Sequence, residues 1–224
     1  MKKLALLFMF TGTILFAQEP ITTKLGDFNG IKVFNGLSVE LKKSSTSKIE
    51  ISGSQAGDVS VKNSDGLLKI RLGFPDSFIA EDVKIVLYYK KNIDFLDVNE
   101  GGKIFSNEKL KQEILEVKAQ EGGKMNLNIE AKYLTVKVVS GGKIKLTGTA
   151  KDQNIEVTTG GIYEAFDVES KQVIVVAASG GNADVNVSET LDAKVRFGGT
   201  IYYKGNPDIL QTKKIIGGTI RAID

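Results

Sequence analysis

Residues 134–146 read LTVKVVSGGKIKL, and apolar residues alternate with polar ones on both sides of a central glycine pair. Val136 and Val138 fall on one face of an extended chain before the pair, and Ile144 and Leu146 do so after it. A period of two is typical of a β-strand with one buried face. The stretch therefore predicts two short strands joined by a corner at the glycines.

The glycine pair occurs seven times along the chain. The pairs are Gly101-Gly102, Gly122-Gly123, Gly141-Gly142, Gly160-Gly161, Gly180-Gly181, Gly198-Gly199 and Gly217-Gly218. From each pair to the next, the numbering advances by 21, 19, 19, 20, 18 and 19. Self-similarity at a period of about 20 residues indicates one supersecondary unit stacked repeatedly, each copy burying its apolar face on its neighbours.

Alignment on the glycine pairs produces columns of apolar residues. Two places after each pair the column is Ile104, Met125, Ile144, Tyr163, Ala183, Ile201 and Ile220. Five places before each pair it is Leu96, Val117, Val136, Ile155, Val175, Ala193 and Thr212. The positions between the apolar columns are mostly polar, so each unit has an inward and an outward face.

The repeat is too short to contain helices, because two strands leave only a brief return between them. Successive coils would pair in parallel about 4.8 Å apart, and right-handed crossovers are strongly preferred. The sequence therefore predicts an all-β fold, a right-handed parallel β-helix (β-solenoid) with about 19–20 residues per rung. Glycine at each corner would take a positive φ and allow neighbouring backbones to approach.

Residues 28–100 are also rich in predicted strands, but their spacing is irregular. Turn signals such as Asn35-Gly36 and Asp65-Gly66 separate apolar or alternating runs, and Asp65-Gly66 is the strongest β-hairpin candidate. An uncovered first rung would expose a strand edge. This region is therefore expected to begin and cap the β-helix of residues 101–224.

Residues 1–17 have the pattern of a secretory signal peptide. A Lys-Lys start precedes an apolar run that ends at Phe16, and the expected cut follows Ala17. The run is too short for a comfortable membrane span, and no later stretch is long and apolar enough, so no transmembrane segment is expected in the mature chain. Residues 18–27 would form a linker, and the predicted location is secreted: periplasm, cell surface or extracellular.

The composition excludes several classes of function. The 224 residues are 42% hydrophobic and 25% charged, as in an ordinary globular protein. The chain has no Cys and no His, which excludes thiol catalysis, Ser-His-Asp triads and ordinary zinc sites. It has no phosphate-cradling glycine loop, so no cofactor or metal is predicted.

The charge pattern argues against nucleic acid as a partner. Loss of Lys2 and Lys3 with the signal peptide lowers the formal net charge from +3 to +1. The remaining lysines are spread along the chain, and no alternation of basic and aromatic residues marks a platform for stacking bases.

Four carboxylates suggest an alternative interpretation as an enzyme. β-Helices host polysaccharide lyases and glycosidases that use clustered carboxylates, and Asp94, Asp97 and Glu100 are followed one rung on by Glu121. However, Asp97 would stack on Lys118, as in a solvated charge ladder. The ladder is the favoured reading, the catalytic cluster is the alternative, and no catalytic residue is assigned.

Lys103, Lys124 and Lys143 form a column beside the corner on three successive rungs. Stacked ammonium groups about 5 Å apart repel one another, so this column is a candidate ligand site for an anion such as an acidic glycan or a lipopolysaccharide phosphate. Glu100 and Glu121, on the other side of the same glycines, are the expected neutralising partners.

Tyr202 is a further candidate ligand-binding residue, because an exposed aromatic ring can stack on a sugar. Its neighbour Tyr203 is expected to face inward by alternation.

Ile174 and Val176 form a candidate interface. Both occupy outward positions, where other rungs carry polar residues, and a strand that is apolar on both faces is covered on both. The cover is either the loop of residues 73–82, which contains Phe74 and Phe78, or another molecule. Self-association therefore joins a glycan or cell-surface ligand among the expected partners.

Three stretches resemble a known family. They are FNGIKVFNGLSVEL at residues 28–41, GLLKI at residues 66–70 and GTIYYKGNP at residues 199–207. With the glycine-pair rungs, they resemble the secreted bacterial "head GIN" domain proteins, described as "putative auto-transporter adhesins" and common in Bacteroidetes. The resemblance covers nearly the whole mature chain. It implies a single-stranded right-handed β-helix and an envelope or extracellular location.

The resemblance adds no catalytic motif. Rungs of relatives often read Ser-Gly-Ala-Gly, whereas this chain has Gly-Gly followed by Lys, Ile, Asn or Thr. That departure leaves the implied fold intact but changes the surface that the corner presents.

The favoured hypothesis is a non-enzymatic, secreted or cell-envelope β-helical binding or adhesin-like module with a glycan as its candidate ligand. The alternative is a carbohydrate-active β-helix enzyme of the polysaccharide lyase or glycosidase type. Binding to polysaccharides without product formation would favour the first hypothesis. New reducing ends or unsaturated products would favour the second.

Overall fold

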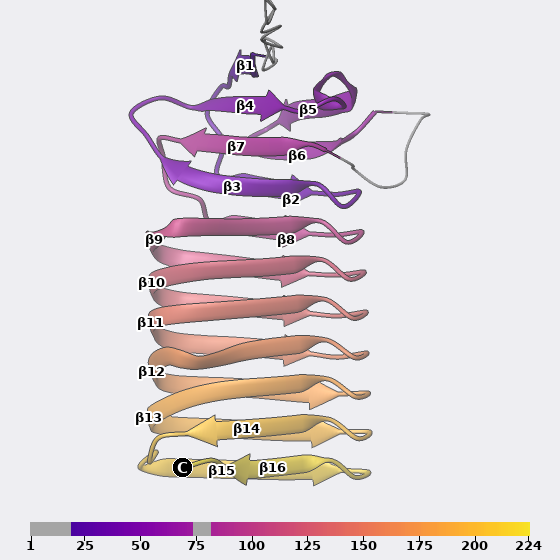
Figure 1. Ribbon diagram of the computed structural model, residues 1–224. Helices are drawn as coiled ribbons and strands as arrows, with labels where there is room; N and C mark the ends of the chain where they lie inside the picture. Colours follow the sequence, from indigo (N-terminus) through magenta and orange to yellow (C-terminus); the bar gives the residue numbers. More distant parts are fainter. Residues whose placement is uncertain (1–18, 74–81) are drawn as a thin grey trace, which may run out of the picture.

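The computed structural model describes residues 19–73 and 82–224, which form a stack of parallel β coils (Figure 1). The strands of these residues join in one sheet of 16 strands, and the single helical segment among them is a short 3₁₀ turn, Ala56–Asp58. Followed through Figure 1, the chain winds as a right-handed solenoid of about 7 turns. The predicted fold class is confirmed. The predicted signal peptide lies outside the described residues.

Five long strands make up the regular part of the solenoid. They are β9 (Lys103–Ala119), β10 (Lys124–Val138), β11 (Lys143–Val157), β12 (Ile162–Ala178) and β13 (Asn182–Arg196). Each begins after a glycine pair, runs along the front layer, bends at a corner and returns along the back layer (Figure 1). The sequence predicted two short strands per coil. The coil is instead one strand of 15 or 17 residues, because parallel pairing continues through the corner.

The last coils use shorter strands. They are β14 (Thr200–Lys204), β15 (Ile209–Ile215) and β16 (Thr219–Ala222). The strand stops at the corner near Pro207, which has no N–H to donate to a ladder. In β15 the inward columns carry Thr212 and Lys214, both exposed, where the preceding coil has Ala193 and Val195.

Parallel register places equivalent positions of successive coils directly above one another. This stacking forms the core. Met125 pairs with Ile104 on one side and with Ile144 on the other, and all three are at most 2% exposed. Tyr163 continues this column and is fully buried. The predicted inward columns therefore form the apolar interior between the two layers.

A type I′ turn forms the corner at each glycine pair. In the turn at residues 139–142, Ser140 and Gly141 have φ values of 49° and 71°, and the Gly142 N–H donates to the Val139 carbonyl at 2.9 Å. Positive φ at both central residues defines this turn. The positive φ thus falls on the first glycine and on the residue before it.

The second glycine of the pair serves a different purpose. A Cβ at Gly161 would lie 2.6 Å from the Val138 carbonyl oxygen of the preceding coil, and one at Gly142 would collide with the Ala119 carbonyl. Neither has a positive φ. The predicted close approach of backbones is therefore confirmed, whereas positive φ at the second glycine is wrong for the regular coils.

Uneven intervals between glycine pairs correspond to β-bulges. The longest interval, from Gly101 to Gly122, contains a register shift where β9 is longer than β10, between Phe105 and Lys109. The next longest contains another, between Glu164 and Glu169 of β12. The extra residues bulge near the corner opposite the glycine pairs and leave the inward columns aligned.

Two coils precede the first glycine pair. In one, β2 (Gly30–Val33) and β3 (Ser38–Lys43) flank Asn35-Gly36, whose φ values of 55° and 70° repeat the type I′ turn. β2 pairs with β8 (Phe95–Val98) and β3 with β9. The other coil comprises β6 (Leu67–Leu72) and β7 (Lys84–Tyr89), which pair in parallel with β2 and β3.

Antiparallel strands close this end of the stack. β4 (Lys48–Ser52) pairs with β7, and β1 (Ile21–Lys24) pairs with β4. β5 (Val59–Ser64) pairs with β6 through the Asp65-Gly66 turn, which confirms the predicted hairpin. A change to antiparallel pairing ends the parallel ladder of the coils.

Candidate functional site

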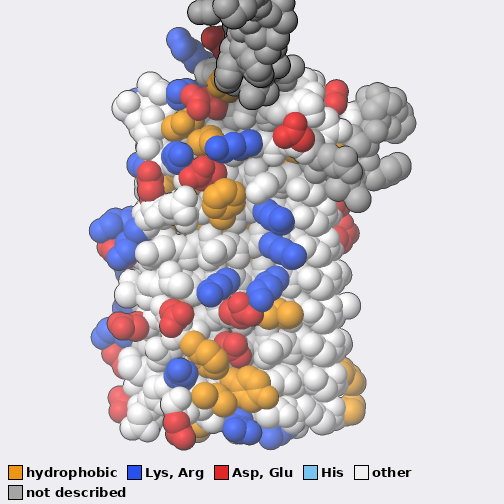
Figure 2. All heavy atoms as spheres, viewed as in Figure 1, with side chains coloured by type: hydrophobic (Ala, Val, Ile, Leu, Met, Phe, Trp, Pro, Cys, Tyr) orange, Lys and Arg blue, Asp and Glu red, His pale blue; other side chains and the backbone are white. Residues whose placement is uncertain are grey.

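The lysine column Lys103, Lys124 and Lys143 lies on the front layer in direct register. Lys124 pairs with Lys103 on β9 and with Lys143 on β11. The three side chains line a shallow hollow of about 550 Å³ together with Lys145 and Phe105. Figure 2 shows basic side chains gathered on this face over β9 to β11. The structure therefore brings the three predicted residues together on one surface.

One carboxylate forms an ion pair with this group of lysines. The Lys143 ammonium lies 2.6 Å from Glu164 Oε1. Among residues 19–73 and 82–224, Lys103, Lys124 and Lys145 form no ion pair. The expected neutralisation by Glu100 and Glu121 is wrong: neither forms an ion pair with these lysines in the described part of the chain, and the Glu100 carboxylate accepts a hydrogen bond from Asn35 Nδ2 at 2.7 Å.

Two neighbouring carboxyl groups border the lysines on the C-terminal side. Glu164 and Asp184 are in register on β12 and β13. Burial raises the pKa of Asp184 above its ordinary value, and the negative charge of Glu164 raises it further. Asp184 Oδ1 and Asn182 Oδ1 are both buried and have no hydrogen-bond partner within the described part of the chain.

Aromatic side chains continue the front layer beyond these carboxyl groups. Tyr202 is in register with Asp184 and is half-buried on the outward face. Phe166 lies in the β12 bulge, and the Lys204 ammonium sits 5.2 Å from the centre of its ring. Tyr203 packs against the core, as alternation predicts. Figure 2 shows apolar side chains on this face below the lysines.

The carboxylates of the enzyme alternative do not converge. Asp97 is 2% exposed, forms a salt bridge of 3.0 Å with Lys32 and accepts a hydrogen bond from Asn99 Nδ2 at 3.0 Å. Asp94 accepts a hydrogen bond from Asn29 Nδ2 at 3.2 Å. Asp97 and Lys118 are in register, but the ion pair of Asp97 is with Lys32. These groups tie the first coils together.

Ile174 and Val176 face outward on the back layer, as predicted. Ile174 is 53% exposed and lies between the polar residues Asn154 and Asp192 of adjacent coils. The loop considered as a cover begins beside Gly73, whose N–H donates to the Asp58 carbonyl in the N-terminal cap. Phe74 and Phe78 lie outside the described residues. The covering of this patch stays a prediction.

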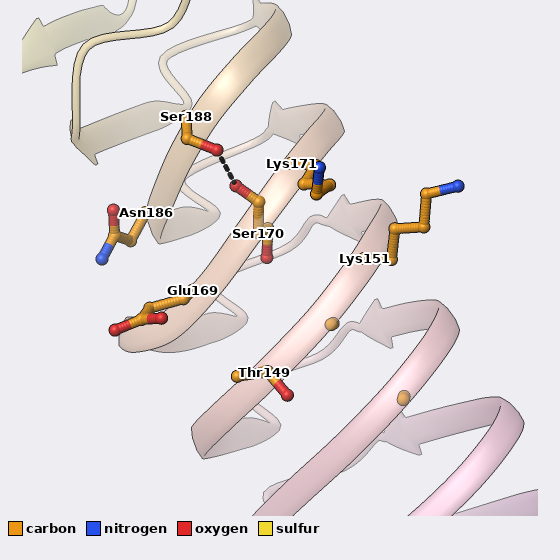
Figure 3. Close-up of a pocket in the computed structure, with 9 residues that line it drawn as sticks. Thr149, Lys151, Glu169, Ser170, Lys171, Asn186 and Ser188 are labelled. Atoms are coloured by element: carbon orange, nitrogen blue, oxygen red, sulfur yellow. Dashed lines mark hydrogen bonds between the residues drawn. The ribbon is translucent and has the colours of Figure 1, made fainter.

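The sequence did not predict a hollow that lies at the corner opposite the glycine pairs. It has a volume of about 740 Å³ over β10 to β13, and its floor comprises the small residues Ala131, Ala150 and Ser170. Figure 3 shows Lys151 and Glu169 extending away from the floor in different directions, with Ser188 donating to the Ser170 carbonyl. Small residues in register at the corner are the signal that could have found it.

Residues 19–73 and 82–224 contain no cluster of three or more His, Cys, Asp or Glu side chains arranged to hold a metal ion. They also contain no helix of the length and apolar character needed to cross a membrane.

Comparison with solved structures finds proteins of the same fold. The chain is similar to a "putative adhesin" from Bacteroides fragilis, with a TM-score of 0.84 and 22% identity over 91% of this chain and 96% of that chain. A "putative adhesin" from Parabacteroides distasonis has a TM-score of 0.74 and 20% identity over 91% and 96%. A "putative lipid binding protein" from the same species has a TM-score of 0.67 and 20% identity over 92% and 97%. At such identities the likeness concerns the fold alone.

A family model that matches most of the sequence identifies the family of this chain. No curated protein matches this chain. The model described as "Putative auto-transporter adhesin, head GIN domain" matches residues 27–207, which is most of the sequence. The resemblance seen in the sequence is confirmed, and the chain belongs to the head GIN domain family.

Proposed function

We propose that this protein is a non-enzymatic, adhesin-like module of the cell envelope that binds an acidic glycan on the lysine column. Membership of a family described as adhesins supports a binding role. The signal-peptide pattern of residues 1–17 supports export to the envelope or the exterior. The dispersed carboxylates give no support to a catalytic cluster.

The observation that carries the proposal is the stack of unpaired ammonium groups. Lys103 and Lys124 are exposed, in register and without an ion pair in the described part of the chain. Coils lie about 4.8 Å apart, so like charges on adjacent coils repel. An anionic ligand that lies along the stack would relieve this repulsion at each coil it crosses.

The aromatic side chains nearby support a sugar as the body of that ligand. Tyr202 and Phe166 lie on the same layer as the lysines. An aromatic ring presents an apolar face with a polar edge, which suits a sugar ring that is apolar on one side. An acidic glycan would thus meet lysines at its charged groups and aromatic rings at its neutral faces.

The test is retention on immobilised heparin and other acidic glycans. The triple variant Lys103→Gln, Lys124→Gln and Lys143→Gln should bind about tenfold or more weakly, because three exposed ion pairs contribute together about 1–3 kcal/mol. Thermal unfolding should change little, since the side chains are at the surface.

The matched control removes three other lysines. Lys62, Lys69 and Lys151 are exposed and lie away from the front-layer hollow. Their change to Gln has the same effect on net charge and should leave retention near that of the wild type. Unchanged retention of the first variant would reject the lysine column as the site. New reducing ends or unsaturated products from the glycans would support an enzyme instead.

A further inference from the structure

The first central residue of the corner turn, which directly precedes the glycine pair in the regular coils, changes character along the solenoid. It is polar in the first six turns of this kind and apolar in the last two: Asn35, Glu100, Glu121, Ser140, Thr159, Ser179, Phe197 and Ile216. All eight have φ values between 47° and 55°. One backbone conformation is therefore built with two different kinds of side chain.

Phe197 and Ile216 do not suit this conformation. At positive φ, a β-branched or bulky residue is a steric outlier, whereas Asn and small polar residues tolerate it better. Both side chains are also exposed, Phe197 by 57% and Ile216 by 71%, so they contribute little to the core. A residue that strains the backbone and leaves its apolar surface in water is a candidate for binding.

Basic residues precede each of the two apolar tips in the chain. Residues 193–223 contain one acidic residue, Asp208, and six basic residues: Lys194, Arg196, Lys204, Lys213, Lys214 and Arg221. Arg196, Lys213 and Lys214 are exposed and lie just before the two turns. At the other end of the same edge the turns carry Glu100 and Glu121. Figure 2 shows apolar side chains at the edge where the last turns lie.

We propose that the C-terminal end of this edge docks on an anionic lipid surface, with Phe197 and Ile216 inserted among the headgroups. Apolar side chains flanked by Lys and Arg are the combination that binds an anionic membrane interface. Two protruding side chains are too small a patch for a stable protein interface, which buries about 800 Å² on each partner. Glu100 and Glu121 would be repelled, so this end alone faces the lipid.

A tryptophan reporter tests the insertion directly. The chain has no Trp, so Phe197→Trp provides a single indole at the proposed contact. Its emission should shift to shorter wavelength with phosphatidylglycerol–phosphatidylcholine vesicles and not with pure phosphatidylcholine. Thr159→Trp, at the same turn position in a middle coil, is the control and should show no shift. An equal shift in both variants, or none in either, would overturn the proposal.

Co-sedimentation with the same vesicles tests which residues contribute. Phe197→Ser with Ile216→Ser copies the residue at turns 140 and 179 and should lower binding about tenfold or more. Thermal stability should be unchanged or higher, because Ser strains the turn less. Lys103→Gln, Lys124→Gln and Lys143→Gln together should leave vesicle binding intact, which separates this site from the glycan site.

Three results would contradict the lipid contact. The wild type could fail to sediment with anionic vesicles, or the double serine variant could sediment as the wild type does. A wild type that is dimeric in solution, with a monomeric serine variant, would assign the tips to a second copy of the chain.

Discussion

At the scale of single residues, the two glycines of a pair meet different steric demands. Gly160 has a φ of 69° and open space where a Cβ would stand. Gly161 lacks a positive φ, but a Cβ there would lie 2.6 Å from the Val138 carbonyl oxygen. The first glycine is required by conformation and the second by the approach of the neighbouring coil.

The same substitution at both positions should separate these two demands. Gly160→Asn should cost less than about 1 kcal/mol of unfolding free energy, because Asn tolerates the left-handed region. Gly161→Asn should cost about 3 kcal/mol, since the preceding coil must move to admit the side chain. Urea unfolding of the two variants measures both. Equal losses would show that the carbonyl contact does not constrain the coil.

The residues of the core show what the sequence could and could not predict. Alternation placed Val136, Ile144 and Tyr163 in the interior correctly, because burial of one strand face leaves a direct pattern. It could not predict that the Tyr163 hydroxyl donates to Gln153 Oε1 at 2.7 Å and that Gln153 Nε2 donates to Ser170 Oγ at 2.5 Å. That network joins residues of two coils, and burial raises the pKa of Tyr163.

At the scale of strands, the meeting of β12 and β13 creates an electrostatic conflict. Parallel register places Asp184 beside Glu164, whose carboxylate already forms an ion pair with the Lys143 ammonium. Burial first, and Glu164 second, raise the pKa of Asp184 above its ordinary value of 3.8. Between these two pKa values the folded chain binds more protons than the unfolded chain. The free energy of unfolding therefore falls as the pH rises through this window.

Asp184→Asn should stabilise the protein at neutral pH, because it removes a charge that the folded state disfavours. The gain should shrink as the pH is lowered from the raised pKa of the folded state to below 3.8, where the carboxyl is protonated in both the folded and the unfolded state. Unfolding midpoints measured across this range test the prediction. Asp167→Asn removes an exposed carboxylate from the same strand β12 and is the control. A gain that does not vary with pH would contradict the assignment.

The strands also limit what sequence reasoning could say about the site. The register of the lysine column followed from the spacing of the glycine pairs that precede Lys124 and Lys143. The partner of Lys143 did not, because Glu164 lies two places further along the next coil and reaches back diagonally. Bulges such as that in β12 displace side chains near the corner opposite the glycine pairs. The average length of the repeat does not reveal these displacements.

At the scale of the whole molecule, each coil contacts mainly its two neighbours, so stability varies along the stack. β11 pairs with β10 and β12 over its full length, whereas β15 pairs with β13 alone. The exposed Thr212 and Lys214 in the inward columns of β15 bury little apolar surface there. The last coil therefore has the weakest packing of the regular stack.

Amide hydrogen exchange should follow this gradient. β15 and β16 should exchange fastest among the strands of the solenoid, and β10 to β12 should exchange slowest, because local opening requires fewest contacts at the end of the stack. Mass spectrometry of peptides from each coil measures the order. Protection of β15 equal to that of β11 would indicate that something covers the last coil.

The inward columns stay aligned from coil to coil, so the coils of the solenoid mark regular steps along its axis. Each coil advances the chain by about 4.8 Å along the axis. A whole coil, for example residues 143–161, can be lost or duplicated without misaligning the inward columns, because it begins and ends at equivalent points of the repeat. Such an event would change the separation of Lys103 from Phe197 along the axis by one coil spacing, and loss of this particular coil would also remove Lys143 from the lysine column. Along the axis, distances between surface features on different coils are therefore close to multiples of the coil spacing.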